Sequence, residues 1–173
     1  MRRIVVVGAV LAAPMLAAAG VAVASGSGPY KPGFIHDPLA GAEELAIADV
    51  PPAILHSARV ALDGGEVTGA QLDRDAPLAI YEIAGTTGNT EVEVDVRPDA
   101  TIEEIEVLIT DADVPDVVSS LLASVFPDFV PETIEKSIRP TEIGLLETWY
   151  EFGGAEFDVE INSTATEYLV EPA

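Results

Sequence analysis

The sequence predicts an α+β fold of two tandem repeats, each a helix followed by a four-stranded antiparallel β-meander. The first observation is a recurrence. Asp49-Val50-Pro51 returns 64 positions later as Asp113-Val114-Pro115, and an apolar run at helical spacing follows each copy. The second is a Tyr-Glu-apolar triplet, starting at Tyr81 and at Tyr150, that runs into a glycine. Internal repetition indicates the architecture before any single residue is considered.

Each repeat is expected to begin with its helix. Asp49 and Asp113 are the expected N-caps, because an aspartate side chain can accept hydrogen bonds from the first backbone N–H groups. A proline follows each aspartate by two positions, in the first turn, where a missing N–H costs nothing. The first helix is expected to stop at Gly64-Gly65 and the second at Pro127.

Four strands are expected after each helix. Acidic and apolar residues alternate along 91–96 and again along 156–161, and this third observation indicates half-buried strands. Each sheet should therefore have one apolar face, covered by the helix, and one solvated acidic face. The expected strands are 69–75, 77–84, 91–96 and 101–109 in the first repeat, and 129–138, 145–152, 155–161 and 166–170 in the second.

The N-terminus has the layout of a secretory signal peptide. Arg2-Arg3 precede an uncharged stretch that ends in Ala22-Val23-Ala24, so we expect cleavage after Ala24 and a secreted or periplasmic protein. The alternative is a retained anchor, because about 20 apolar residues can also span a bilayer. The expected division is a signal peptide at 1–24, a flexible leader with a short helix at 25–48, and repeats at 49–110 and 111–173.

The chain is strongly acidic. It carries 30 acidic and 8 basic residues, a net charge of −22, and loss of the two arginines in 1–24 would make it −24. Nucleic acids and anionic membranes are polyanions, so neither is an expected partner. Cations or a basic protein would be attracted, and a saline habitat is the alternative reading because counterions screen self-repulsion. The chain has no cysteine, so its core must provide its stability.

No catalytic arrangement is evident among the reactive residue types. His36 and His56 lack the spacing of a zinc site, and Gly26-Ser27-Gly28 lacks the strand–turn–helix setting of a nucleophilic serine. The acids of the alternating strands, and the pair Glu103-Glu104, lack a pocket that would separate their pKa values. We therefore predict no enzyme activity, no catalytic residue and no cofactor.

Of the two metals considered, calcium fits the residues of this chain better than zinc does. Asp111, Asp113 and Asp116 bring three carboxylates together between the repeats, and calcium accepts six to eight oxygen ligands. The segment has neither the glycine bend nor the downstream glutamate of a calcium loop, and Asp113 is already explained as a helix cap. No metal site is predicted.

The order of these motifs resembles PepSY domains, in the exported group related to β-lactamase-inhibitor proteins. The resemblance covers roughly residues 49–171 and implies noncatalytic domains that bind or restrain exported enzymes such as proteases and β-lactamases. Ala100 stands where the family's turn usually carries glycine, and Asn162-Ser163-Thr164 has neither the acid nor the glycine of that turn. The motifs that carry it are Val50-Pro51, Tyr81-Glu82-Ile83, 91–95 and 102–105 in the first repeat, and Val114-Pro115, 149–152 and 157–161 in the second.

We expect an exported noncatalytic protein that binds, and inhibits or restrains, a secreted or periplasmic enzyme. Alternation places Trp149 on the outer sheet face, where it could anchor a partner, although packing under a loop or between the repeats is the alternative. The hairpin loop at 85–89 is a second contact surface, because inhibitors of the resembled group insert loops into enzyme clefts. The predicted partner-binding residues are Trp149, Glu91, Glu93, Asp95, Glu156, Asp158, Glu160, Thr86, Thr87 and Asn89. The alternative function is an acidic envelope protein that binds Ca²⁺ or other cations.

Overall fold

The computed structural model describes residues 42–74, 79–141 and 144–172. The expected signal peptide or anchor, the serine at position 27 and His36 all lie outside these residues. Among the described residues, no helix is long and apolar enough to cross a membrane.

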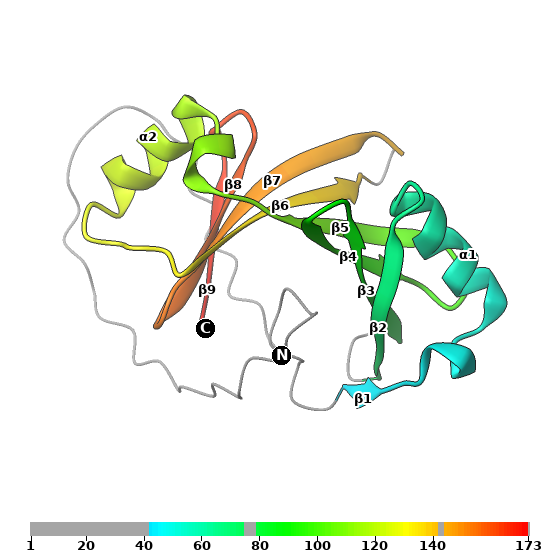
Figure 1. Ribbon diagram of the computed structural model, residues 1–173. Coiled ribbons are helices and arrows are strands. Elements are labelled where there is room, and N and C mark those ends of the chain that lie inside the picture. Colours follow the sequence, from blue (N-terminus) through cyan, green and yellow to red (C-terminus); the bar gives the residue numbers. More distant parts are fainter. Residues whose placement is uncertain (1–41, 75–78, 142–143, 173) are drawn as a thin grey trace. The chain divides into compact units, whose positions relative to one another are not determined.

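The strands of the described chain form one nine-stranded antiparallel sheet, in which neighbours follow the chain order from β1 to β9 (Figure 1). The predicted fold class is therefore wrong, because one sheet replaces two helix-plus-meander repeats. Strand β5 pairs directly with β6, for example Ile105 with Ile138, and this pairing removes the sheet edge that would have separated the repeats. The strands are β1 (Glu43–Glu44), β2 (Glu66–Asp73), β3 (Ile80–Thr87), β4 (Thr90–Val96), β5 (Ile102–Leu108), β6 (Thr133–Pro140), β7 (Leu146–Gly153), β8 (Phe157–Asn162) and β9 (Tyr168–Pro172).

Two α-helices occur in the described residues, α1 (Pro52–Ala61) and α2 (Asp116–Val125), and a short 3₁₀ helix precedes each. These 3₁₀ helices, Ile47–Asp49 and Asp111–Asp113, displace the expected caps: Pro51 and Pro115 occupy the N-cap positions of α1 and α2. Residues 42–48, expected in a leader with a short helix, hold β1 and the start of the first 3₁₀ helix.

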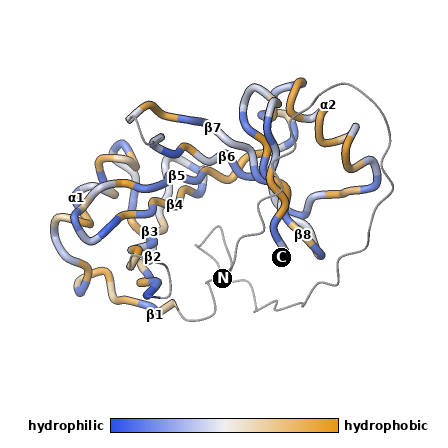
Figure 2. Tube along the Cα trace, turned by 180° about the vertical axis from the view of Figure 1, so that it is seen from behind, coloured by the Kyte–Doolittle hydropathy of each residue, from blue (hydrophilic) through white to orange (hydrophobic). Residues whose placement is uncertain are grey.

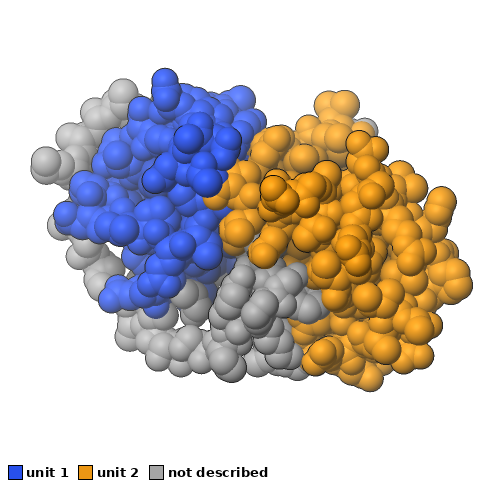
Figure 3. Space-filling model, viewed as in Figure 1, with its two compact units in different colours: residues 1–27, 110–134, 149–173 blue, residues 28–109, 135–148 orange. Residues whose placement is uncertain are grey.

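The chain divides into two compact units, coloured in Figure 3. Among the described residues, unit 1 contains 110–134 and 149–172, and unit 2 contains 42–74, 79–109, 135–141 and 144–148. Within the described residues, one boundary between the units follows β5, and the other two fall inside β6 and β7. Residues 135–141 and 144–148 therefore group with the residues that precede α2.

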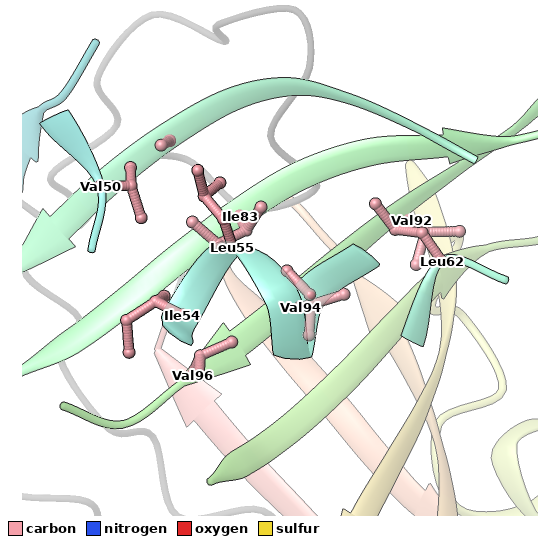
Figure 4. Close-up of a cluster of buried hydrophobic side chains, with 10 residues drawn as sticks. Val50, Ile54, Leu55, Leu62, Ile83, Val92, Val94 and Val96 are labelled. Carbon is pink, nitrogen blue, oxygen red and sulfur yellow. The ribbon is translucent and has the colours of Figure 1, made fainter. Parts of the chain in front are cut away.

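The core of unit 2 lies between α1 and one face of β3, β4 and β5 (Figure 4). Ile54, Leu55, Ala58 and Leu62 recur at helical spacing and face the strands. Burial of one such aliphatic side chain contributes about 1.5–3 kcal/mol, so this face fixes the helix on the sheet. The buried strand residues of the same core are Ala70 on β2, Ile83 on β3, and Val92, Val94 and Val96 on β4.

Two tight turns in unit 2 bear on the sequence predictions. Gly88 has φ +64° at the β3–β4 hairpin, which suits the first central position of a type II′ turn. Ala100 also has a positive φ, of 68°, although it carries a Cβ. The Ser57 hydroxyl donates to the Ala100 carbonyl at 2.8 Å and ties this strained turn to α1.

Unit 1 has its own apolar centre. Helix α2 packs against β8, and most of α2 is coloured as hydrophobic in Figure 2. Phe129 stacks on Phe157 with 5.0 Å between ring centroids, and Phe126 meets Tyr168 edge-on at 5.8 Å. Such aromatic pairs add about 0.5–1.5 kcal/mol each beyond the area that they bury.

Candidate functional site

The sheet face of unit 2 that points away from α1 carries carboxylates at adjoining strand positions. Asp95 lies directly between Glu82 on β3 and Glu104 on β5 in the strand ladder, and Glu93 lies opposite Glu106. Directly paired residues of antiparallel strands have Cβ atoms about 4.5–5.5 Å apart on one side of the sheet. These five residues, Glu82, Glu93, Asp95, Glu104 and Glu106, are called the acidic cluster below.

The acidic cluster is largely removed from water. Glu82, Glu93 and Glu106 are only 9%, 3% and 6% exposed. The expectation of a solvated acidic face is therefore wrong in unit 2. Strand alternation assigns each residue to a face, but it carries no information about how much of a polar face other parts of the chain will bury.

Asp95 occupies the electrostatic centre of this cluster. Burial raises the pKa of its carboxyl well above the ordinary value, and repulsion from Glu106, Glu93, Glu82 and Glu104 raises it further. Like charges in direct cross-strand positions destabilise a sheet. The folded protein therefore favours a proton, or another positive charge, at Asp95.

Glu104 is the member of the cluster that a basic residue holds. Arg139 on β6 donates from Nε to Glu104 Oε1 at 2.5 Å, and the Ser137 hydroxyl donates to the same oxygen. Burial and Glu106 raise the pKa of Glu104, while Arg139 and Ser137 lower it. One oxygen of Glu104 is thus already committed to protein donors.

Gln71 extends the row of polar residues onto β2. It is the ladder partner of Glu82, so its side chain is on the same face as the acidic cluster. The residue is fully buried at 0% exposure, and neither its amide oxygen nor its amide nitrogen has a hydrogen-bond partner in the described part of the chain. Oδ1 of Asp95 is also buried and also lacks a hydrogen-bond partner among the described residues. An unsatisfied buried polar group costs about 1–3 kcal/mol, so these atoms require an explanation.

The acids continue toward β6. One carboxylate oxygen of Glu106 and one of Glu135 lie within 4.8 Å of each other, and both residues are buried. The acidic cluster and its neighbours Gln71, Glu135 and Ser137 offer carboxylate, amide and hydroxyl oxygens, a set of ligand atoms typical of sites for calcium, magnesium or manganese. His56, the one histidine among the described residues, is exposed on α1, across the sheet from the acidic cluster.

The predicted partner-binding residues fall in both units. Glu93 and Asp95 belong to the acidic cluster, Glu91 is half-buried on the same strand, and the hairpin residues Thr87 and Asn89 are exposed in unit 2. Thr86, beside the hairpin, is half-buried. In unit 1, Glu156 is exposed, Asp158 is half-buried and Glu160 is buried, and Trp149 is 7% exposed rather than lying open on an outer face. Their role in partner binding remains a prediction.

Sequence reasoning missed Gln71, Glu82, Glu104 and Glu106 as site residues. Glu104 and Glu106 alternate along β5 as Glu93 and Asp95 do along β4, so the strand pattern could have found them. No sequence pattern distinguishes Gln71, because its isolation depends on what its amide group meets in the fold.

The aspartates between the predicted repeats do not form a comparable site. Asp113 accepts hydrogen bonds at Oδ2 from the Thr110 backbone N–H at 3.1 Å and from the Thr110 hydroxyl at 2.7 Å. These bonds lower the pKa of Asp113 and form a capping box around the 3₁₀ helix. The carboxylate is explained by local structure.

Comparison of the chain with protein-family models, with curated proteins and with solved structures finds no match. The resemblance to PepSY domains therefore stays a prediction that rests on the short motifs quoted above.

Proposed function

We propose that this chain is an exported, noncatalytic protein that binds divalent cations, calcium foremost, at the acidic cluster of unit 2. The observation that carries the proposal is the position of Asp95, with Glu82, Glu93, Glu104 and Glu106 around it on one sheet face. A bound cation would replace mutual repulsion with attraction to every one of these carboxylates.

Burial favours a small ligand over a macromolecular one. Glu82, Glu93 and Glu106 expose less than a tenth of their surface, so the side chains of a partner protein have little access to them. A metal ion needs only oxygen atoms at about 2.3–2.6 Å. The all-oxygen donor set favours calcium or magnesium over zinc or copper, which prefer nitrogen and sulfur ligands.

Calorimetric titration and thermal unfolding of the purified chain test the proposal. After treatment with EDTA, addition of CaCl₂ should release or absorb heat at a defined stoichiometry and should raise the melting temperature. A ligand at 100 times its dissociation constant stabilises the folded state by about 2.7 kcal/mol. NaCl at matched ionic strength is the control, because it screens charge without occupying a site. If NaCl reproduces the whole effect, or if millimolar CaCl₂ has none, the proposal is wrong.

A second candidate function is protein binding, as the family resemblance implies. The observation that favours it is a pair of neighbouring leucines in unit 2, Leu145 and Leu146, which are 62% and 75% exposed. Large exposed apolar side chains mark interaction surfaces where they belong to a contiguous patch. The chain should then lower the activity of an exported protease or β-lactamase in a one-to-one complex. A double substitution of both leucines by serine should abolish this effect, while an Asp95→Asn variant should retain it.

A further inference from the structure

The buried amide of Gln71 has no role in a site made of carboxylates alone. Its oxygen and its nitrogen both lack a partner among the described residues, although Glu82 lies directly across the strand pair. Protonation of Glu82 would give the Gln71 oxygen an O–H donor, but it would relieve the repulsion at one carboxylate only. A cation would satisfy that oxygen and the carboxylates together.

We propose that Gln71, Glu82 and Asp95 form one calcium site, in which the amide oxygen of Gln71 is a neutral ligand beside two carboxylates. This inference rests on the proposed function and adds the ligands and the ion. The three residues occupy one continuous ladder row on β2, β3 and β4, since Gln71 pairs with Glu82 and Glu82 pairs with Asp95.

The spacing of the strands suits this assignment. Neighbouring strands lie about 4.7–4.9 Å apart, roughly twice a calcium–oxygen distance. An ion above the row can therefore contact side chains from adjacent strands. Gln71 and Glu82 have long side chains that can lean toward it, and the orphaned Oδ1 of Asp95 supplies a third oxygen.

Glu104 is not among the proposed ligands although it continues the same row. Its Oε1 already accepts from Arg139 and Ser137, and the guanidinium next to it repels a cation. The site is therefore placed at the β2–β4 end of the row.

The identity of the ion follows from the amide ligand. Calcium accepts six to eight oxygens in irregular geometry and commonly includes amide or backbone carbonyls. Magnesium requires near-ideal octahedral geometry and keeps several waters. Three side chains fixed by sheet geometry meet the calcium requirement more readily, and water molecules would complete the coordination.

Nuclear magnetic resonance gives a direct readout, because the chain has one glutamine and only two asparagines, Asn89 and Asn162. Three side-chain amide pairs should therefore appear in a ¹⁵N correlation spectrum. Stoichiometric CaCl₂ should shift the Gln71 pair strongly. The Asn89 pair is exposed, and the Asn162 amide donates to Thr166 at 3.0 Å in unit 1, so both should stay in place.

Variants then separate this inference from the proposed function. Gln71→Leu should melt in EDTA at the wild-type temperature or above, because an orphaned amide is removed, and should bind calcium about tenfold more weakly or worse. Gln71→Glu keeps an oxygen at the site and should bind calcium at least as tightly as the wild type. Glu66→Gln, an exposed charge change on the same strand, is the matched control and should alter affinity less than twofold.

These experiments distinguish failure of the Gln71 site from failure of the proposed function. If calcium binds the wild type by calorimetry but the Gln71 amide pair does not move and Gln71→Leu keeps full affinity, the Gln71 site is wrong while the proposed function stands. If the wild type does not bind calcium, the proposed function fails. If Gln71→Leu does not fold, the Gln71→Glu affinity and the wild-type spectrum still decide.

Discussion

Substitution of Asp95 by asparagine should stabilise the calcium-free protein. The change removes the central charge of the acidic cluster and keeps the size and shape of the side chain. Direct like-charge pairs across a sheet each cost about 0.2–1 kcal/mol, and Asp95 has two of them, with Glu82 and with Glu104. The variant also avoids the cost of burying a charged carboxylate, and this adds to the gain in stability. We expect Asp95→Asn to be more stable by at least about 1 kcal/mol at pH 8 in EDTA.

The gain should depend on pH in a definite direction. The pKa of Asp95 is raised in the folded protein, so the folded state holds its proton more tightly than the unfolded state does. Wild-type stability should therefore fall as the pH rises from the ordinary aspartate pKa through the raised one. The variant lacks this proton. It keeps the pH dependence of the groups that both proteins share, such as Glu104, whose pKa is also raised. The gap between the two proteins should be small near pH 4 and should widen toward pH 8.

Urea unfolding at a series of pH values, in EDTA and then in millimolar CaCl₂, measures this gap. For a chain of this size, 1 kcal/mol corresponds to roughly 2–4 °C in melting temperature, so thermal scans provide a second measure. Calcium should reverse the order, because the wild type offers the ion a charged carboxylate at position 95, whereas the variant offers a neutral amide oxygen that binds it more weakly. A variant less stable than the wild type at pH 8 in EDTA, or a gap that does not change with pH, would refute the reasoning.

Three further predictions concern the fold of unit 2. Ala100→Gly should stabilise the protein by about 0.5–1 kcal/mol in urea unfolding, because φ at this residue is 68° and glycine adopts it without the Cβ clash. Ile54→Ala should lower the free energy of unfolding by about 2–5 kcal/mol in the same assay, because Ile54 is 1% exposed. Val60, on the other side of α1, is 64% exposed, so Val60→Ala should change it by less than about 0.5 kcal/mol. Gly85→Ala should lower the melting temperature, because its new Cβ would lie 2.6 Å from a methyl carbon of Leu62 and would force β3 away from α1.

The sequence predicted local structure better than the connection between local parts. Alternation along 91–96 correctly indicated that Val92, Val94 and Val96 share one face, and these residues meet α1 in the core. The same alternation could not show that β5 would pair with β6, because pairing across a sheet depends on contacts distant in sequence. The repeat pattern was read as two separate sheets for this reason.

The candidate site was predicted only in part, because its residues come from strands that are far apart in the sequence. Glu93 and Asp95 were predicted because they lie on one strand. Glu82 and Glu104 become their neighbours only through the strand register, and burial of Gln71 depends on the packed structure. A single sequence contains the alternation but not the register that assembles these strands.

Adaptation to salt and a binding site make different demands on acidic residues. An acidic surface suited to salty water places its carboxylates where counterions can screen them, and this reading fits exposed residues such as Glu156 and Glu66. It does not fit Glu93 and Glu106, which are buried opposite each other and gain little from solvent ions. Buried like charges lower stability unless a positive charge joins them. The net charge of the chain thus contains an exposed and a buried population, and the proposed cation would act on the buried one.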